Sequence, residues 1–158
     1  MFRNFCYEYR LERIGREKNA ESWINEALGK RQKIMGMGHR VYKAKDPRSV
    51  IMENYLLKLS QKNNDDRYYK ILKEIERVMK EKMEAKGKPI YPNVDFFSGA
   101  VYRLLGIEPV FFTPIFAIAR VAGWLAHILE QRSDNRIFRP KSLYSGPEPR
   151  KFVPIENR

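Results

Sequence analysis

Apolar side chains recur at helical spacing along nearly the whole of this chain of 158 residues. An apolar residue at every third or fourth position gives a helix one buried face, and the broadest such face falls between Asp66 and Gly87. Two helix starts are marked by a capping residue followed by proline, Asp46-Pro47 and Thr113-Pro114. We find no internal repeat and no convincing strand pattern. The sequence therefore predicts an all-α protein.

Caps and helix breakers set the expected helix boundaries. We expect helices over residues 20–29, 47–60, 67–87, 95–105 and 114–131, followed by an extended tail from residue 133. The second helix should bury Val50, Ile51, Tyr55 and Leu59, or their neighbours. The third should bury one broad face, made of Tyr68, Ile71, Leu72, Ile75, Val78, Met79 and Met83. The last helix is apolar on several sides, so it needs protein around it.

Composition limits the partners and the compartment. The 31 Lys and Arg residues against 19 Asp and Glu give a net charge of +12, which attracts polyanions such as coenzyme A or nucleic acid. The basic residues are dispersed and the aromatics fall mostly on helix faces, so nucleic acid is not the expected partner. Cys6 is the only cysteine, which excludes an internal disulfide framework and a structural zinc site and favours the cytoplasm. The sequence contains no run of about 18 apolar residues, so we do not expect a membrane span.

Two polar motifs suit chemistry on an anionic substrate. The segment GMGHRVYKAKDPR places His39 in a glycine-flanked loop, where a ligand contact is favoured over a core position, and adds the cations Lys43 and Arg48. The later segment PNVDFFSG places Asp95 where a loop enters a helix. There its carboxylate could act as a general base, or it could merely cap the helix.

These motifs resemble those of the citrate synthase family. The resemblance rests on GMGHRVYKAKDPR, PNVDFFSGAVY, FAIAR and FRPKSLYSGPEPRKFVPI in the family's order, and it runs from about Ile14 to the C-terminus. It implies an unmatched segment over residues 1–13, a small helical domain that binds coenzyme A over 14–112, and a helix and tail of the large domain over 113–158. The family's HGG-type histidine motif is absent, since His39 and His127 are the only histidines. The chain therefore resembles the C-terminal part of a citrate synthase.

The resemblance also implies roles for individual residues. His39 would donate a hydrogen bond to the keto oxygen of oxaloacetate, and Asp95 would remove a proton from the methyl group of acetyl-CoA. The residues implied to bind oxaloacetate are Asn93, Arg48, Phe116, Arg120 and Arg139. Arg139 would reach into the neighbouring subunit's site, which requires a homodimer.

Coenzyme A would be bound by the glycine-containing loop. The implied contacts are backbone groups that read the adenine and a lysine near the phosphates, at Met35, Gly36, Met37, Gly38 and Lys43. Coenzyme A enters as a substrate and leaves as a product, and the resemblance implies no permanently bound cofactor and no metal. The implied reaction condenses acetyl-CoA with oxaloacetate to citrate and coenzyme A in the complete enzyme, and we expect this chain to be inactive alone.

Two other functions stay open at the level of sequence. One is a portion of a 2-methylcitrate synthase, which uses propionyl-CoA and differs by one methyl group in the substrate. The other is a non-catalytic basic module that binds coenzyme A or nucleic acid. His127 is expected to be structural, and Cys6 has no activating neighbourhood that would make it reactive.

Overall fold

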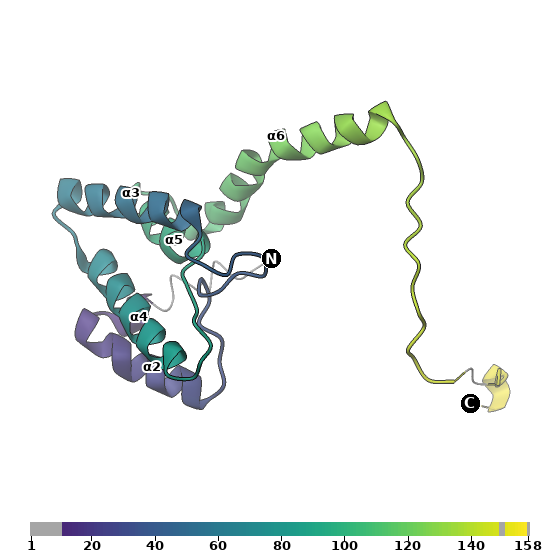
Figure 1. The fold of residues 1–158 in the computed structure, drawn as a ribbon, viewed down its shortest axis with the longest axis horizontal. Helices are drawn as coiled ribbons and strands as arrows, with labels where there is room; N and C mark the ends of the chain where they lie inside the picture. The colour runs from purple at the N-terminus through teal and green to yellow at the C-terminus, as the bar shows by residue number, and fades with distance from the viewer. Residues whose placement is uncertain (1–10, 149–150, 158) are drawn as a thin grey trace. The chain divides into compact units, whose positions relative to one another are not determined.

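The computed structural model describes residues 11–148 and 151–157, and helices dominate them (Figure 1). No strand occurs in these residues, which contain a single isolated antiparallel bridge, between Met37 and Pro92. The all-α prediction is confirmed. In chain order the elements are the 3-10 turn η1 (Glu17–Asn19), α2 (Ala20–Gly29), α3 (Pro47–Asn63), α4 (Arg67–Glu84), α5 (Asp95–Leu104), η2 (Pro109–Phe111), α6 (Phe112–Ser133) and η3 (Ile155–Asn157).

The chain divides into two compact units, Met1–Val121 and Ala122–Arg158. The division falls within α6, whereas the resemblance implied boundaries at residues 13 and 112, which stay predictions. In the first unit α3 packs against α5, and α2 packs against α4. The second unit holds the remainder of α6 and the segment that follows it.

The core of the first unit lies between these helix pairs. The face predicted for α4 is confirmed, because the six positions from Tyr68 to Met79 are buried and Met83 packs against the core. From α5, Phe96 and Phe97 are fully buried and meet edge to face, with ring centroids 4.9 Å apart. These two aromatic rings directly follow Asp95, so the core anchors the helix end that carries this carboxylate.

The prediction for the buried face of α3 allowed either four named residues or their neighbours, and the buried residues are mostly the neighbours. Val50, Ile51 and Tyr55 are exposed, and the buried positions are Ser49, Leu56 and Ser60. Leu59, also predicted, is partly buried against the core. Apolar residues lie on several sides of α3, so their spacing does not define one face, and the packing against α5 decides which stripe is covered.

Several helix ends differ from the predictions: α4 ends at Glu84 instead of residue 87, α5 ends at Leu104 instead of 105, and α6 spans Phe112–Ser133 instead of 114–131, so Thr113-Pro114 does not mark its start. Helix α3 continues to Asn63, past the expected end near Ser60, and stops where Asn64 adopts a left-handed conformation with φ of +51°. Asn19 directly precedes α2, but its side chain makes no capping bond and instead donates to the carbonyl of Ile14 at 2.8 Å. It thus ties the start of α2 to the preceding segment.

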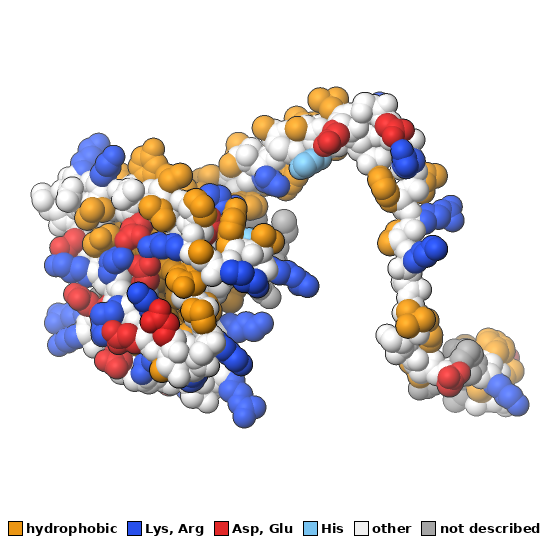
Figure 2. Space-filling view, viewed as in Figure 1, with side chains coloured by type: hydrophobic (Ala, Val, Ile, Leu, Met, Phe, Trp, Pro, Cys, Tyr) orange, Lys and Arg blue, Asp and Glu red, His pale blue; other side chains and the backbone are white. Residues whose placement is uncertain are grey.

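Helix α6 is apolar and mostly uncovered. Its only buried residue is Phe112, and Figure 2 shows hydrophobic side chains along it. The large exposed apolar residues of this helix are Phe116, Ile118, Val121, Trp124, Leu125, Ile128 and Leu129. By length and composition alone the segment Pro109–Ser133 could cross a membrane, with a mean hydropathy of 1.5 in its most apolar window, which corrects the expectation that no such segment exists. Core helices of soluble proteins have the same composition, so this is weak evidence for a membrane.

Candidate active site

Backbone hydrogen bonds join the two motifs into one site. The Gly38 N–H donates to the carbonyl of Tyr91 at 2.7 Å, and the Asn93 N–H donates to the carbonyl of Gly36 at 2.9 Å. The Asn93 side chain adds a third bond, from Nδ2 to the carbonyl of Gly38 at 2.8 Å. Segments 55 residues apart in sequence therefore lie side by side.

Two of the glycines are required by this close approach. Gly36 and Gly38 have φ of +83° and +85°, in the left-handed region that favours glycine. A Cβ at Gly36 would lie 2.9 Å from the Cα of Phe96, and a Cβ at Gly38 would lie 3.3 Å from the side chain of Ile90. The first of these glycines lets the loop pack directly on the backbone of α5.

His39 follows these glycines and is exposed. Its Nδ1 accepts hydrogen bonds from the backbone N–H groups of Val41 and Tyr42, at 3.1 and 3.2 Å. The Tyr42 ring packs on the imidazole with centroids 4.7 Å apart. Because Nδ1 acts as an acceptor, Nε2 is the nitrogen that carries the proton and can donate to a ligand.

A pocket of about 440 Å³ opens beside this histidine. Its walls come from both loops and are formed by Gly38, His39, Tyr42, Lys43, Ala44, Pro89, Ile90 and Tyr91. Lys43 thus lies at a pocket, where an ammonium can attract an anionic ligand. Met35 and Met37 are partly buried next to the glycines and do not line this pocket.

Arg48 is held by a buried carboxylate. Asp46 accepts from Arg48 Nε at 3.1 Å and from Nη2 at 2.8 Å, and also from the Arg48 backbone N–H at 2.9 Å, which makes it the predicted cap of α3. The guanidinium lowers the pKa of Asp46, and a backbone hydrogen bond from Val94 adds to this effect. The Arg48 side chain nevertheless remains 52% exposed, so a guanidinium in a fixed position stays accessible to a ligand.

Asp95 does not cap α5. The N-cap residue is Val94, whose side chain makes no capping bond, and the first N–H of the helix, that of Asp95, donates to Asn93 Oδ1 at 2.9 Å. The alternative interpretation of Asp95 as a helix cap is therefore wrong. Asp95 is exposed as a whole, and the partial burial of its carboxyl raises its pKa. The charge of Arg48 opposes the rise, that of Asp46 adds to it, and His39 opposes it, so these groups all act on the carboxyl.

Sequence reasoning missed three contributors to this site. Tyr42 packs on His39 and lies 5.8 Å from the Arg48 guanidinium, and Asp46 holds Arg48 in addition to capping α3. Tyr102 follows Asp95 by two helical turns, and burial together with the Asp95 charge raises the pKa of its phenol. The seven-residue spacing on one helix face was a usable signal for Tyr102.

The other predicted residues of the described chain lie on α6 and in the segment after it. Phe116 and Arg120 are exposed on α6 and make no polar or ring contact with any described residue. Arg139 is exposed in the second unit, and His127 is exposed on α6 with Nδ1 3.5 Å from Glu130. Cys6 lies outside the described residues. Within the described ranges no three His, Cys, Asp or Glu side chains could hold a metal ion together.

Comparison with known proteins identifies the class to which this fold and site belong. The family model described as "Citrate synthase, C-terminal domain" matches residues 7–141, which starts ahead of the Ile14 expected from the motifs. The chain therefore belongs to the citrate synthase family.

Relatives and a solved structure agree with this family. The chain is 50% identical over 148 residues to the citrate synthase of Synechocystis, and 42% identical over 142 residues to the 2-methylcitrate synthase of Shewanella oneidensis. These matches cover 94% and 90% of the chain. It also matches a citrate synthase of Thermoplasma acidophilum, solved as a ternary complex with carboxymethyl coenzyme A and oxaloacetate, with a TM-score of 0.85, 36% identity and 98% coverage of the chain.

The chain corresponds to only part of each relative. It spans 37% of the Synechocystis protein, 36% of the Shewanella protein and 42% of the Thermoplasma chain. The match to the solved structure nevertheless includes nearly all of this chain, so α6 and much of the tail belong to the shared fold.

Proposed function

We propose that this chain is the C-terminal portion of a citrate synthase and supplies most of its catalytic side chains. The observation that carries the proposal is the set of hydrogen bonds that joins the motif of His39 and Arg48 to the motif of Asp95. The proposed reaction of the complete enzyme condenses acetyl-CoA, oxaloacetate and water to citrate and coenzyme A.

In this proposal Asp95 is the general base. Its carboxylate takes a proton from the methyl group of acetyl-CoA, and the electron pair left on that carbon forms the enolate. The raised pKa of Asp95 supports this role, because a stronger base has a larger driving force for removing a weakly acidic proton. The thioester oxygen must be stabilised at the same time, which is the role of the histidine in the HGG-type motif that this chain lacks.

His39 acts on the other substrate. Its Nε2 donates to the keto oxygen of oxaloacetate and stabilises the alkoxide that forms when the enolate carbon attacks the keto carbon. The two backbone N–H groups at Nδ1 support this role because they fix the ring and its tautomer. Water then hydrolyses the thioester, which releases coenzyme A.

Substrate binding would use the cations and the pocket. Arg48 would pair with a carboxylate of oxaloacetate, supported by its fixed and half-exposed guanidinium, while Arg120, Phe116 and Arg139 would complete the site in the assembled homodimer. Both ends of the Asn93 side chain are engaged, so we assign it to positioning the loops. Coenzyme A would lie along the loop from Met35 to Lys43, using the pocket beside His39. The ternary complex of the Thermoplasma relative supports both ligands.

A portion of a 2-methylcitrate synthase is the second candidate, favoured by the 42% identity to the Shewanella enzyme. A non-catalytic basic module that binds coenzyme A is a third possibility, supported only by the pocket and the net charge. We further propose a cytoplasmic location, since one cysteine fits a reducing compartment.

A chimera tests the function. The segment that the chain lacks would be taken from the Synechocystis relative, joined to this chain, and assayed for thiol release with oxaloacetate and either acetyl-CoA or propionyl-CoA. We expect release that depends on oxaloacetate and prefers acetyl-CoA, and none from the 158-residue chain alone. A preference for propionyl-CoA would favour the second candidate. A folded chimera that binds coenzyme A and releases no thiol would favour the binding module.

A further inference from the structure

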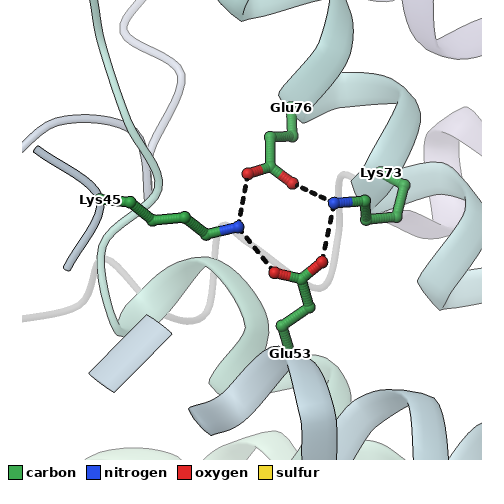
Figure 3. Close-up of polar contacts among 4 residues, drawn as sticks. All are labelled: Lys45, Glu53, Lys73 and Glu76. Carbon is green, nitrogen blue, oxygen red and sulfur yellow. Dashed lines mark hydrogen bonds and ion pairs between the residues drawn. The ribbon is translucent and has the colours of Figure 1, made fainter. Parts of the chain in front are cut away.

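Lys45 lies in the loop that carries His39, between two functional parts of that loop. Lys43 and Ala44 before it line the pocket, and Asp46 after it holds Arg48 and caps α3. Its ammonium Nζ lies 2.7 Å from Glu53 Oε2 and 2.7 Å from Glu76 Oε1 (Figure 3). A residue next to the pocket is thus tied to helices α3 and α4.

Lys73 closes these contacts into a ring. Its Nζ lies 2.7 Å from Glu53 Oε1 and 2.7 Å from Glu76 Oε2, so each carboxylate accepts from both ammonium groups (Figure 3). Three members of the ring come from helices, and Lys45 is the one that comes from the loop. We call these four residues the Lys45 ring.

The Lys45 ring is charged and sheltered from water. The two carboxylate side chains are only 17% and 16% exposed, so salt screens these pairs less than pairs on an open surface. Burial alone would lower the pKa of Lys45, but hydrogen bonds to Glu53 and Glu76 raise it overall. Burial likewise opposes ionisation of Glu53, and the two lysines lower its pKa overall. Lys45 is therefore an ammonium at neutral pH and holds two carboxylates.

Near Lys45, the loop that carries His39 makes few other contacts with the rest of the chain. Its first part is bonded through Gly36 and Gly38 to the second motif. Among the described residues, the segment from His39 to Ala44 makes hydrogen bonds only within itself, to His39 Nδ1. Lys45 is the next fixed point, and its ammonium also lies 5.7 Å from the ring centroid of Phe97 on α5.

We propose that Lys45 is a positioning residue that sets the geometry of the segment 39–44, and thereby the ligand affinity of the pocket and the orientation of His39. The inference rests on the proposed function for the identity of the ligand, coenzyme A. Lys73 provides a matched control, because it makes two equivalent ion pairs in the same ring from helix α4, outside the loop.

The test compares Lys45→Met with Lys73→Met in the 158-residue chain. Hydrogen exchange of the Val41 and Tyr42 amides reports directly on the His39 contacts, and we expect it to rise about tenfold in Lys45→Met and to change less than about twofold in Lys73→Met. Affinity for coenzyme A, measured by calorimetry, should weaken about fivefold in Lys45→Met alone. Lys45→Arg should restore both values, since arginine can donate to both carboxylates.

Three outcomes are decisive. Equal loop exchange in the two methionine variants would overturn the proposal, because the Lys45 ring would then only stabilise the helices. Faster exchange in Lys45→Met without any binding of coenzyme A to the unmodified chain would support Lys45 and contradict the proposed ligand. Where Lys45→Met fails to fold, Lys45→Gln is compared instead, and unchanged exchange in that variant overturns the proposal.

Discussion

The candidate site, which two loops form, differs from helix α6 in how its side chains are held. Around the site, Gly36, Gly38 and Asn93 are bonded across the motifs, Arg48 is fixed by Asp46, and Phe96 and Phe97 are fully buried below. Along α6 only Phe112 is buried, and the side chains that the family resemblance assigns to the substrate are exposed.

This difference indicates which part of the proposed enzyme is built by this chain itself. Contacts within the chain fix the side chains of His39 and Arg48, whereas Arg120 and Phe116 make no polar or ring contact with any described residue. The chain spans 37% of its Synechocystis relative, so the additional chain in such proteins is available to cover an apolar helix. The predictions below test whether the two regions respond to substitution as differently as their packing suggests.

The largest expected effect on stability is at the core below the site. Phe97→Ala removes a fully buried ring and should lower the free energy of unfolding by about 3–5 kcal/mol. Denaturant unfolding of the 158-residue chain measures this, with Leu129→Ala on α6 as control. The control side chain is 69% exposed, so the change should be within about 0.5 kcal/mol. Similar losses in both variants would remove the contrast between the regions.

The next effect concerns the rate of the complete enzyme. In the chimera, Asp95→Asn should lower turnover about a hundredfold or more and leave oxaloacetate affinity nearly unchanged, since it removes the base and keeps the shape. Steady-state kinetics and oxaloacetate titration separate the two quantities. His39→Ala should impair both. Near-normal citrate formation by Asp95→Asn would show that another group is the base.

The close approach of the loop to α5 gives a third prediction. Gly36→Ala should lower the free energy of unfolding by about 2–3 kcal/mol, because it combines a left-handed φ with a Cβ 2.9 Å from the Cα of Phe96. Gly87→Ala is the control, with φ of +65° and no atom within 4 Å of the added Cβ. It should cost about 1 kcal/mol. Equal losses would mean that the loop yields without strain.

The Asp46–Arg48 pair predicts a dependence on pH. The folded-state pKa of Asp46 is lowered, so its stabilisation is present above the unfolded value near 3.8 and is lost as pH falls through the folded pKa. The raised pKa of Asp95 acts in the opposite direction, because protonation of Asp95 at acid pH favours the folded state. Asp46→Asn keeps a capping residue and removes the charge, so it should cost about 1 kcal/mol at pH 7 and less at pH 3. An equal loss at both pH values would contradict the charge effect.

The smallest effect on stability is expected on α6. Ile118→Gln combined with Leu129→Gln should change the free energy of unfolding by less than about 0.5 kcal/mol, since these side chains are 73% and 69% exposed. The same pair should reduce binding of a hydrophobic dye and self-association in size-exclusion chromatography, because apolar surface drives both. Unchanged dye binding would show that α6 is already covered in solution.

Local signals in the sequence predicted much of this fold. Asp46-Pro47 gave the start of α3, and the apolar face of α4 followed from its spacing. The buried face of α3 was predicted only to within a neighbouring position, because its apolar residues surround the helix and the covering partner, α5, comes some 30 residues later. Propensity carries no information about which side meets such a partner.

In the candidate site, too, contacts between residues far apart in the sequence could not be predicted. The residue types and the resemblance singled out His39, Arg48 and Asp95, and hydrogen bonds join the two motifs that carry them. The sequence did not predict the Lys45 ring, because Lys45 and Glu76 are 31 positions apart and lysine and glutamate are common on helix surfaces. The engagement of Asn93 with Gly38, 55 positions away, was missed for the same reason.

The hydrogen bonds between Gly38 and the second motif also constrain the order of folding. They close a loop of more than 50 residues, and the entropy lost on closing it is recovered only when the intervening helices α3 and α4 have already shortened the path. A growing chain released only as far as α4 has no acceptor for the Gly38 amide, since Tyr91 follows that helix. The loop that carries Gly38 thus leaves the ribosome before the segment it bonds to, and it acquires its shape only after that segment has emerged.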